Sequence, residues 1–223
     1  MGVSYTGTLV RSGTETATLV RRTYALVFAS VCVTAASVVA AQQSPDLMAS
    51  IFAHPFITLI LMFGSLIMAQ RTAAPFNLGL VGVFTMLEGF FLAPFLAVAE
   101  TRSPGITGQA GMLTLSTFAV LTAYATLSRR DFSAWGAFFI TGLWVLIAAS
   151  LINLFFPTAI GSLWLAAGTV LVFSGLLVFD TWRIVRSGRY GPDDYVPAAL
   201  NIYLDLLNLF LAIIQLLGGG KRR

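Results

Sequence analysis

Long apolar stretches are the feature that most constrains how this chain can fold. Each has about the 20 residues that an α-helix needs to cross the hydrocarbon core of a bilayer. No water is available there to satisfy the backbone, and the stretches lack period-two alternation, so they are compatible only with helices. We therefore predict an all-α polytopic membrane protein with seven transmembrane helices, over Tyr24–Ala41, Ile51–Gln70, Phe76–Ala99, Ile106–Leu127, Ala134–Phe156, Thr158–Trp182 and Ala198–Leu217.

Composition leaves no room for a separate soluble domain. Of the 223 residues, 57% are hydrophobic and 10% are charged, whereas soluble domains carry about a quarter of their residues as charges. We predict a polar N-terminal tail over residues 1–22, a transmembrane domain over 23–217 and a short basic tail over 218–223. Arg21 and Arg22 before an apolar run are also typical of an export signal. The run is long for a signal-peptide core, so we expect it to be the first span.

The basic residues lie between the apolar stretches, so the net charge of +4 indicates membrane topology and not nucleic-acid binding. If the N-terminus is cytoplasmic, the inside holds Arg11, Arg21, Arg22, Arg71, Arg129, Arg130, Arg183, Arg186 and Arg189. The outside then holds Arg102, Lys221, Arg222 and Arg223. We predict a cytoplasmic N-terminus in a prokaryotic plasma (inner) membrane. The basic tail leaves open that the last helix is re-entrant, and its length of about 30 Å favours a full crossing.

Three residues that occur once each exclude other classes of protein. The single cysteine, Cys32, lies in the first span, which excludes a disulfide framework and a cysteine metal cluster; we expect it to be a small buried side chain. His54, beside Pro55, is predicted to be an interfacial residue and not a metal ligand. The only lysine, Lys221, lies outside the spans, which excludes a retinal Schiff base. No tightly bound cofactor is expected.

Acidic residues inside membrane spans are costly and by default mark function. Asp205 belongs to a polar face of the last helix, because steps of three or four residues return to the same side. That face is formed by Asn201, Asp205, Asn208, Ala212 and Gln215. Since the rest of the helix is apolar, we predict that other helices surround it. Interhelical hydrogen bonding explains the amides but not an unpaired carboxylate.

Asp180 lies near the cytoplasmic end of the sixth span, at a depth similar to that of Asp205 in the antiparallel helix that follows. This predicts that the two carboxyl groups meet. Arg183, at i+3, leaves an interfacial ion pair with Asp180 as the alternative. Ser162 and Thr169 share the face of Asp180. A separate stripe predicts close helix packing and is formed by Gly161, Gly168 and Gly175.

The remaining acids differ in depth. Glu88 lies in mid-span, where it is either protonated and inert or part of a cation or proton relay. Asp193 and Asp194 precede the last helix, whose first position suits Pro197. We interpret this acidic pair as a solvated cap that complements the helix dipole.

These residues lie in strings that resemble the Bax inhibitor-1 family of membrane proteins. The most specific string is in the last helix, Ala199-Leu200-Asn201-Ile202-Tyr203-Leu204-Asp205-Leu206-Leu207-Asn208-Leu209-Phe210. Supporting strings are Phe179-Asp180-Thr181, Ser128-Arg129-Arg130-Asp131-Phe132-Ser133 and Gly89-Phe90-Phe91-Leu92-Ala93-Pro94. The resemblance runs nearly the whole length of the chain.

The resemblance implies a central last helix wrapped by the other six, and a calcium leak that opens in response to pH. By position, Asp180 and Asp205 would be the proton sensor, the gate and a transient calcium site, and Arg71 would be a latch on them. A polar pore or seam would comprise Glu88, Asn201, Asn208 and Gln215. The sequence departs from the family pattern at Glu88, where a small or neutral residue is expected, and at Arg71, which stands alone where a basic run is expected.

We therefore predict a membrane channel, not an enzyme, that leaks calcium under the control of an aspartate pair. Calcium and protons are the expected transported or gating ions, and the bilayer is the expected partner. One alternative is a non-conducting regulator that binds another membrane protein, such as a protease. A second is an intramembrane aspartyl protease, which also uses two aspartates, although the Gly-x-Gly-Asp and Pro-Ala-Leu strings typical of that class are missing.

Overall fold

A computed structural model describes residues 13–191 and 193–219, and these residues form eight helices and no strands. The helices are α1 (Gly13–Gln42), α2 (Pro45–Ala53), α3 (Pro55–Arg71), α4 (Phe76–Arg102), α5 (Ile106–Leu127), α6 (Trp135–Phe155), α7 (Ala159–Val185) and α8 (Tyr195–Gly219). Six are long and apolar enough to cross a membrane, and the bent pair α2 and α3 makes a seventh when it is counted as one span. The all-α prediction with seven spans is confirmed.

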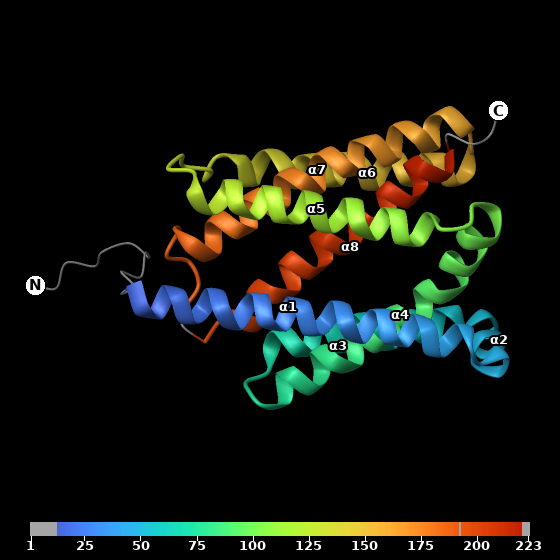
Figure 1. Cartoon of the computed structure of the whole chain (residues 1–223), viewed down its shortest axis with the longest axis horizontal. Coiled ribbons are helices and arrows are strands. Elements are labelled where there is room, and N and C mark those ends of the chain that lie inside the picture. Colours follow the sequence, from blue (N-terminus) through green and yellow to red (C-terminus); the bar gives the residue numbers. More distant parts are fainter. Residues whose placement is uncertain (1–12, 192, 220–223) are drawn as a thin grey trace, which may run out of the picture.

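The helices form two layers, and α8 runs obliquely between them (Figure 1). One layer consists of α5, α6 and α7, and the other of α1 to α4. α8 packs against α1, α3, α4, α5 and α7, whereas α6 packs along α7. Within α8, Gln215 is the only exposed residue. The prediction of a central last helix is therefore confirmed.

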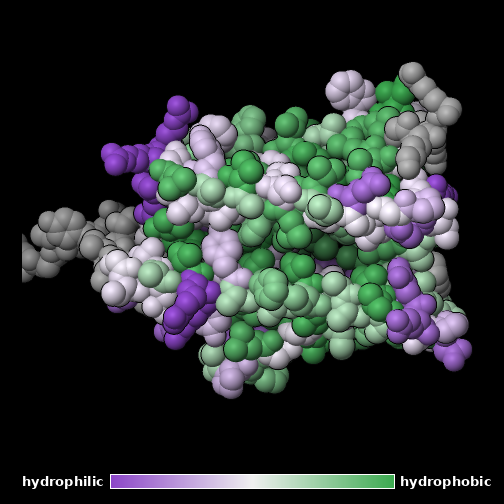
Figure 2. Space-filling view, viewed as in Figure 1, coloured by the Kyte–Doolittle hydropathy of each residue, from purple (hydrophilic) through white to green (hydrophobic). Residues whose placement is uncertain are grey.

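An apolar belt surrounds the bundle, as expected for a surface that faces lipid. In Figure 2 hydrophobic side chains cover the middle of the visible face, and the hydrophilic ones gather toward its two ends. Exposed large apolar side chains occur on every helix that borders this belt, including Phe28, Ile60, Val120 and Trp144. Exposure of so much apolar surface is unfavourable in water but not in lipid, so this belt faces the bilayer. The protein is therefore an integral membrane protein.

The first helix begins at Gly13 instead of Tyr24, so part of the predicted polar tail is helical. Its 30 residues extend about 45 Å, which is longer than the hydrocarbon core of about 30 Å. Leu19, in this extension, is fully buried and packs against α7 and α8. Hydropathy marks only the membrane-crossing part of such a helix. The basic residues Arg11, Lys221, Arg222 and Arg223 lie outside the described residues.

The predicted span Ile51–Gln70 is interrupted, which corrects its expected continuity. α2 and α3 meet at His54 and are bent by 84°. Pro55 lacks an N–H group and disfavours a helical conformation at the residue before it, so the helix breaks there. His54 is exposed at the bend. At the other end of the chain, α8 begins at Tyr195, which places Pro197 within its first turn.

Cys32 is exposed on the outside of α1, so the prediction of a small buried side chain was wrong. A lipid-facing position is as apolar as a core position, and hydropathy does not distinguish them.

The glycine stripe of α7 packs closely on α6 at each of its three positions. A Cβ atom at Gly175 would overlap the ring of Phe139, and one at Gly168 would lie 3.1 Å from Leu146. A Cβ atom at Gly161 would lie 2.6 Å from the hydroxyl of Thr158, the N-cap of the same helix, and 2.9 Å from Asn153 Oδ1 of α6. The predicted close packing is confirmed for all three glycines.

Candidate functional site

Asp180 of α7 and Asp205 of α8 meet inside the bundle. Only 7% of Asp180 and 5% of Asp205 is exposed, and their carboxyl groups lie within hydrogen-bonding reach of each other. The two helices are consecutive, pack closely and run in opposite directions (Figure 1). The structure thus brings together the two carboxyl groups that the sequence places at one depth.

Arg183 supplies the positive charge beside this pair. Its Nη1 atom donates to Asp180 Oδ1 at 2.8 Å, so the ion pair predicted as an alternative is present together with the acid pair. The guanidinium also lies over two aromatic rings, 5.4 Å from the centroid of Phe179 and 5.2 Å from that of Tyr190. Such contacts stabilise a cation where little water reaches it. Of the two aspartates, Asp180 is therefore the one whose ionised form has a cationic partner.

Asp205 has a different environment. Its Oδ2 atom is buried and has no hydrogen-bond partner among the described residues. The neighbouring carboxyl group of Asp180 only accepts hydrogen bonds when ionised. A single proton carried by Asp205 turns this contact between two acceptors into a hydrogen bond. The geometry therefore fits one proton held between the two aspartates.

Tyr190, in the loop between α7 and α8, is a part of the site that the sequence did not indicate. Its hydroxyl accepts a hydrogen bond from Asn201 Nδ2 at 3.0 Å, and its ring covers Arg183. Burial raises the pKa of the Tyr190 phenol above its ordinary value, so the phenol stays neutral. Helical periodicity cannot detect a loop residue, although an aromatic residue shortly before an acidic turn is a usable signal.

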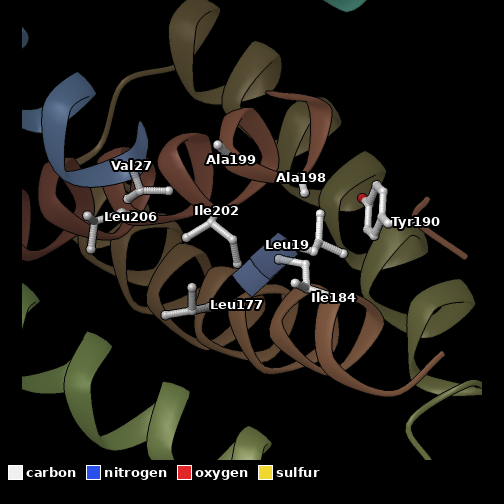
Figure 3. Close-up of a cluster of buried hydrophobic side chains, with 9 residues drawn as sticks. All are labelled: Leu19, Val27, Leu177, Ile184, Tyr190, Ala198, Ala199, Ile202 and Leu206. Carbon is white, nitrogen blue, oxygen red and sulfur yellow. The ribbon is translucent and has the colours of Figure 1, made fainter. Parts of the chain in front are cut away.

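A buried apolar cluster packs around the site (Figure 3). On α8, Leu206 directly follows Asp205 and Ile202 lies one turn before it. On α7, Leu177 and Ile184 lie about one turn to either side of Asp180. Figure 3 shows side chains from α1, α7, α8 and the intervening loop converging there. The members of this apolar cluster are Leu19, Val27, Leu177, Ile184, Tyr190, Ala198, Ala199, Ile202 and Leu206.

A polar cavity lies between α6, α7 and α8, and its lining on α8 begins at Asn208, one turn beyond Asp205. It has a volume of about 290 Å³. Its polar lining residues are Ser150, Asn153, Ser162, Thr169, Asn208 and Gln215. The polar face of α8 and the Ser162 and Thr169 face of α7 therefore do meet. Asn208 Nδ2 donates to the carbonyl of Leu204 on its own helix at 2.8 Å, so this bond does not join α8 to a neighbour.

Glu88 lies on the other side of α8, away from the aspartate pair. It is 7% exposed and contacts the hydroxyl of Tyr203, which also lies 2.7 Å from Thr34 Oγ1 of α1. Two residues along a helix turn by about 200°, so Tyr203 and Asp205 face opposite sides of α8. Glu88 Oε2 has no hydrogen-bond partner in the described part of the chain. Glu88 is therefore part of a second polar cluster and does not line a seam with Asn208 and Gln215.

Arg71 is exposed at the end of α3, and the ion pairs of the described residues do not include it. The guanidinium that contacts Asp180 is that of Arg183, which is one turn away on the same helix. The latch role of Arg71 stays a prediction.

The acids before α8 are solvent-facing, as a cap would be. The side chain of Asp193 is 93% exposed and lies 3.4 Å from Arg22. Asp194 accepts a hydrogen bond from the N–H of Gly191 at 2.7 Å, which closes the turn before the helix.

The described residues contain no group of three or more His, Cys, Asp or Glu side chains that could hold a metal ion. Calcium takes six to eight oxygen ligands when it is held tightly. The transient calcium site at Asp180 and Asp205 stays a prediction.

Fold and site together define a polytopic helical membrane protein with a buried aspartate pair on its last two helices. The family model described as "Inhibitor of apoptosis-promoting Bax1" matches residues 16–223. The chain belongs to the Bax inhibitor-1 family, as the resemblance indicated.

Relatives occur in viruses, animals and bacteria. The Golgi anti-apoptotic protein of vaccinia virus (strain Lister) is 36% identical over 76% of this chain and 71% of its own length. Protein lifeguard 4 of Mus musculus is 35% identical over 77% of this chain and 73% of its own length. An uncharacterized membrane protein of Vibrio cholerae is 36% identical over 74% of this chain and 75% of its own length.

Proposed function

We propose that this protein is a pH-sensitive calcium leak channel of a prokaryotic plasma (inner) membrane. In this proposal a proton held between Asp180 and Asp205 keeps the path closed, and its loss opens the path. The observation that supports it best is the buried pair itself, with an apolar cluster packed around it and a polar cavity whose lining begins one turn farther along α8, at Asn208.

One proton determines the net charge of the site formed by Asp180, Asp205 and Arg183. With Asp205 protonated, this site is neutral, because Asp180 is paired with Arg183. Loss of the proton leaves two carboxylates side by side. At about 4 Å and an effective dielectric constant near 20, they repel each other by about 4 kcal/mol. Part of this repulsion is relieved if α7 and α8 separate or if a cation enters between them.

The surroundings of the pair suggest the route of the ion. The polar cavity supplies hydroxyl and amide oxygens to a cation that approaches from the far end of the bundle. The two carboxylates then bind it transiently. The apolar cluster blocks further passage until the helices that form it move apart. Opening thus requires displacement of α7 relative to α8, which is the movement that the repulsion favours.

The basic residues support a cytoplasmic N-terminus. Arg21 and Arg22 lie at one end of the bundle with Arg129, Arg130 and Arg183, and the positive-inside rule favours a cytoplasmic location for that end. In this topology the apolar cluster is the cytoplasmic barrier and the polar cavity faces outward. Leak activity therefore carries calcium inward, down its gradient.

Calcium entry into proteoliposomes tests the proposal. Flux through the wild-type protein should rise as the pH increases from mildly acidic to mildly alkaline. Asp180→Asn and Asp205→Asn should abolish this pH dependence. Asp193→Asn makes the same chemical change at an exposed acid near the same end of the bundle and should leave it intact. Wild-type pH dependence in both buried variants would overturn the proposal.

Two other outcomes correspond to the alternative functions. A wild-type protein that conducts no calcium at any pH and that co-purifies with another membrane protein would replace the channel with a regulator. Cleavage of a helical reporter substrate that is lost in both aspartate variants would indicate a protease. The ion pair between Asp180 and Arg183 favours the channel, because a catalytic pair needs both carboxyl groups available to a water molecule.

A further inference from the structure

A second cavity, larger than the polar one, lies between α1, α4, α5 and α8 and shares only Leu206 with the apolar cluster. Its volume is about 490 Å³, within the range of typical ligand-binding pockets. The walls are mostly apolar and include Val38 of α1, Leu96 of α4 and Leu207 and Phe210 of α8. Such a cavity is suited to hydrocarbon.

The cavity opens sideways, between α1 and α5. Near the end where α1 begins, these helices touch through the rings of Tyr24 and Phe118, whose centroids are 6.0 Å apart. Toward the other end of the bundle, their side chains instead line the two sides of the cavity. Figure 2 shows a hollow among the hydrophobic side chains of this face. Because both helices are membrane spans, the opening faces the interior of the bilayer.

The depth of the cavity matches one leaflet. Val31 marks its inner end on α1, one turn beyond Thr34, whose hydroxyl meets that of Tyr203. Gln42, the last residue of α1, marks its outer end. Eleven residues separate Val31 from Gln42 on one helix, which corresponds to about 16 Å. Half of a hydrocarbon core is about 15 Å. A chain that starts at the headgroup level would therefore end between Thr34 and Val31.

The mouth of the cavity carries a fixed negative charge. Glu100 Oε2 accepts hydrogen bonds from the Thr107 hydroxyl at 2.8 Å and the Thr107 N–H at 3.2 Å, and Oε1 accepts one from the N–H of Gly105. These bonds hold the carboxylate at the entrance, next to Gln42. A cationic headgroup complements this charge, whereas an anionic headgroup is repelled by it.

We propose that this cavity binds one acyl chain of a phospholipid with an ammonium headgroup, such as phosphatidylethanolamine, from the leaflet at the C-terminal end of α1. The chain lies between α1 and α5 and its headgroup faces Glu100. It contacts Leu207 and Phe210 on α8, the helix that carries Asp205. The lipid thus supports α8 from the side opposite α7. This site does not depend on the proposed channel function.

A glycine in the cavity wall offers a way to fill it. Gly111 lines the cavity, and a Cβ atom there meets no other atom within 4 Å, so Gly111→Leu begins its side chain in open space at the cavity wall. Gly64 of α3 has equally open surroundings but does not line the cavity, which makes Gly64→Leu a matched control for the removal of a helical glycine.

Native mass spectrometry of the purified proteins after incubation with dioleoyl phosphatidylethanolamine tests the proposal. The wild-type protein and Gly64→Leu should retain one lipid, and Gly111→Leu should retain at least tenfold less. Glu100→Gln should lower the ratio of phosphatidylethanolamine to phosphatidylglycerol that is retained. Equal retention by Gly111→Leu and the wild type would overturn the site, and an unchanged ratio in Glu100→Gln would overturn the headgroup assignment.

A measurement on the unmodified protein covers the case in which a variant does not fold. A phosphatidylethanolamine with a photoactivatable group at the end of one chain should cross-link to residues near Thr34 and Tyr203. Adducts spread over the lipid-facing surface of α6, with none in the cavity, would contradict the proposal. Calcium flux is not measured in either experiment, so their outcome is independent of the channel assignment.

Discussion

Replacement of Arg183 by glutamine removes the only cation that contacts the aspartate pair among the described residues. Asp180, whose side chain is 9% exposed, then loses its partner while staying buried. Removal of one member of a buried ion pair costs about 3 to 5 kcal/mol. Because the side chain of Arg183 is 23% exposed, we expect the lower end of that range, about 3 kcal/mol. The free energy of unfolding in mixed micelles, titrated with a denaturing detergent, measures this loss.

A double-mutant cycle separates the ion pair from the packing of the arginine on its aromatic neighbours. Asp180→Asn in the Arg183→Gln background should recover about 2 kcal/mol, because it removes the unpaired charge. Acidification should also reduce the deficit of Arg183→Gln, since a proton on Asp180 neutralises the same charge. Arg22→Gln is the control: its ion pair with Asp193 is exposed and should contribute less than about 1 kcal/mol. Purely additive losses at Arg183 and Asp180 would refute the reasoning.

Three further predictions concern packing and the second polar cluster. Ile202→Ala opens a void in the apolar cluster and should cost about 2 to 4 kcal/mol in unfolding free energy, with higher calcium leak in liposomes at acidic pH. Gly175→Leu should destabilise the protein because the new side chain overlaps the ring of Phe139, and Phe139→Ala should partly restore the melting temperature. Glu88→Gln should change the unfolding free energy by less than about 1 kcal/mol, because an amide of similar shape keeps the contact with Tyr203, whereas a larger loss would show that the carboxyl group is needed.

The fold was predictable to the level of helices because lipid imposes helical structure on long apolar runs. The polar seam of α8 also identified the central helix, since polar groups inside the membrane avoid lipid. The break at His54 and the helical extension before Tyr24 were missed. The first depends on local backbone restriction at Pro55, and the second on the packing of Leu19. Neither changes the mean hydropathy of the segment in which it occurs.

The site was predictable in part, because helical spacing fixes the direction of a residue but not its partner. Matched depth was enough to pair Asp180 with Asp205. Matched depth did not identify the cation that contacts the aspartate pair. Arg183 makes this contact with Asp180, whereas the resemblance assigns it to Arg71. Glu88 has the depth expected of a seam residue, yet it lies on the side of α8 that faces α1 and α4. The contact between Glu88 and Tyr203 in the structure shows which side of α8 Glu88 faces, and the sequence does not predict it.

Infrared difference spectroscopy of the reconstituted protein tests the shared proton most directly, because a protonated carboxyl group has a carbonyl stretch that a carboxylate lacks. The wild-type protein should show a band of this kind that disappears as the pH rises. Glu88→Gln, which removes the other buried carboxyl group with an unpartnered oxygen among the described residues, should keep the band, and Asp205→Asn in the Glu88→Gln background should lack it. A band that persists unchanged in this double variant would contradict the account, since the proton would then reside elsewhere in the protein.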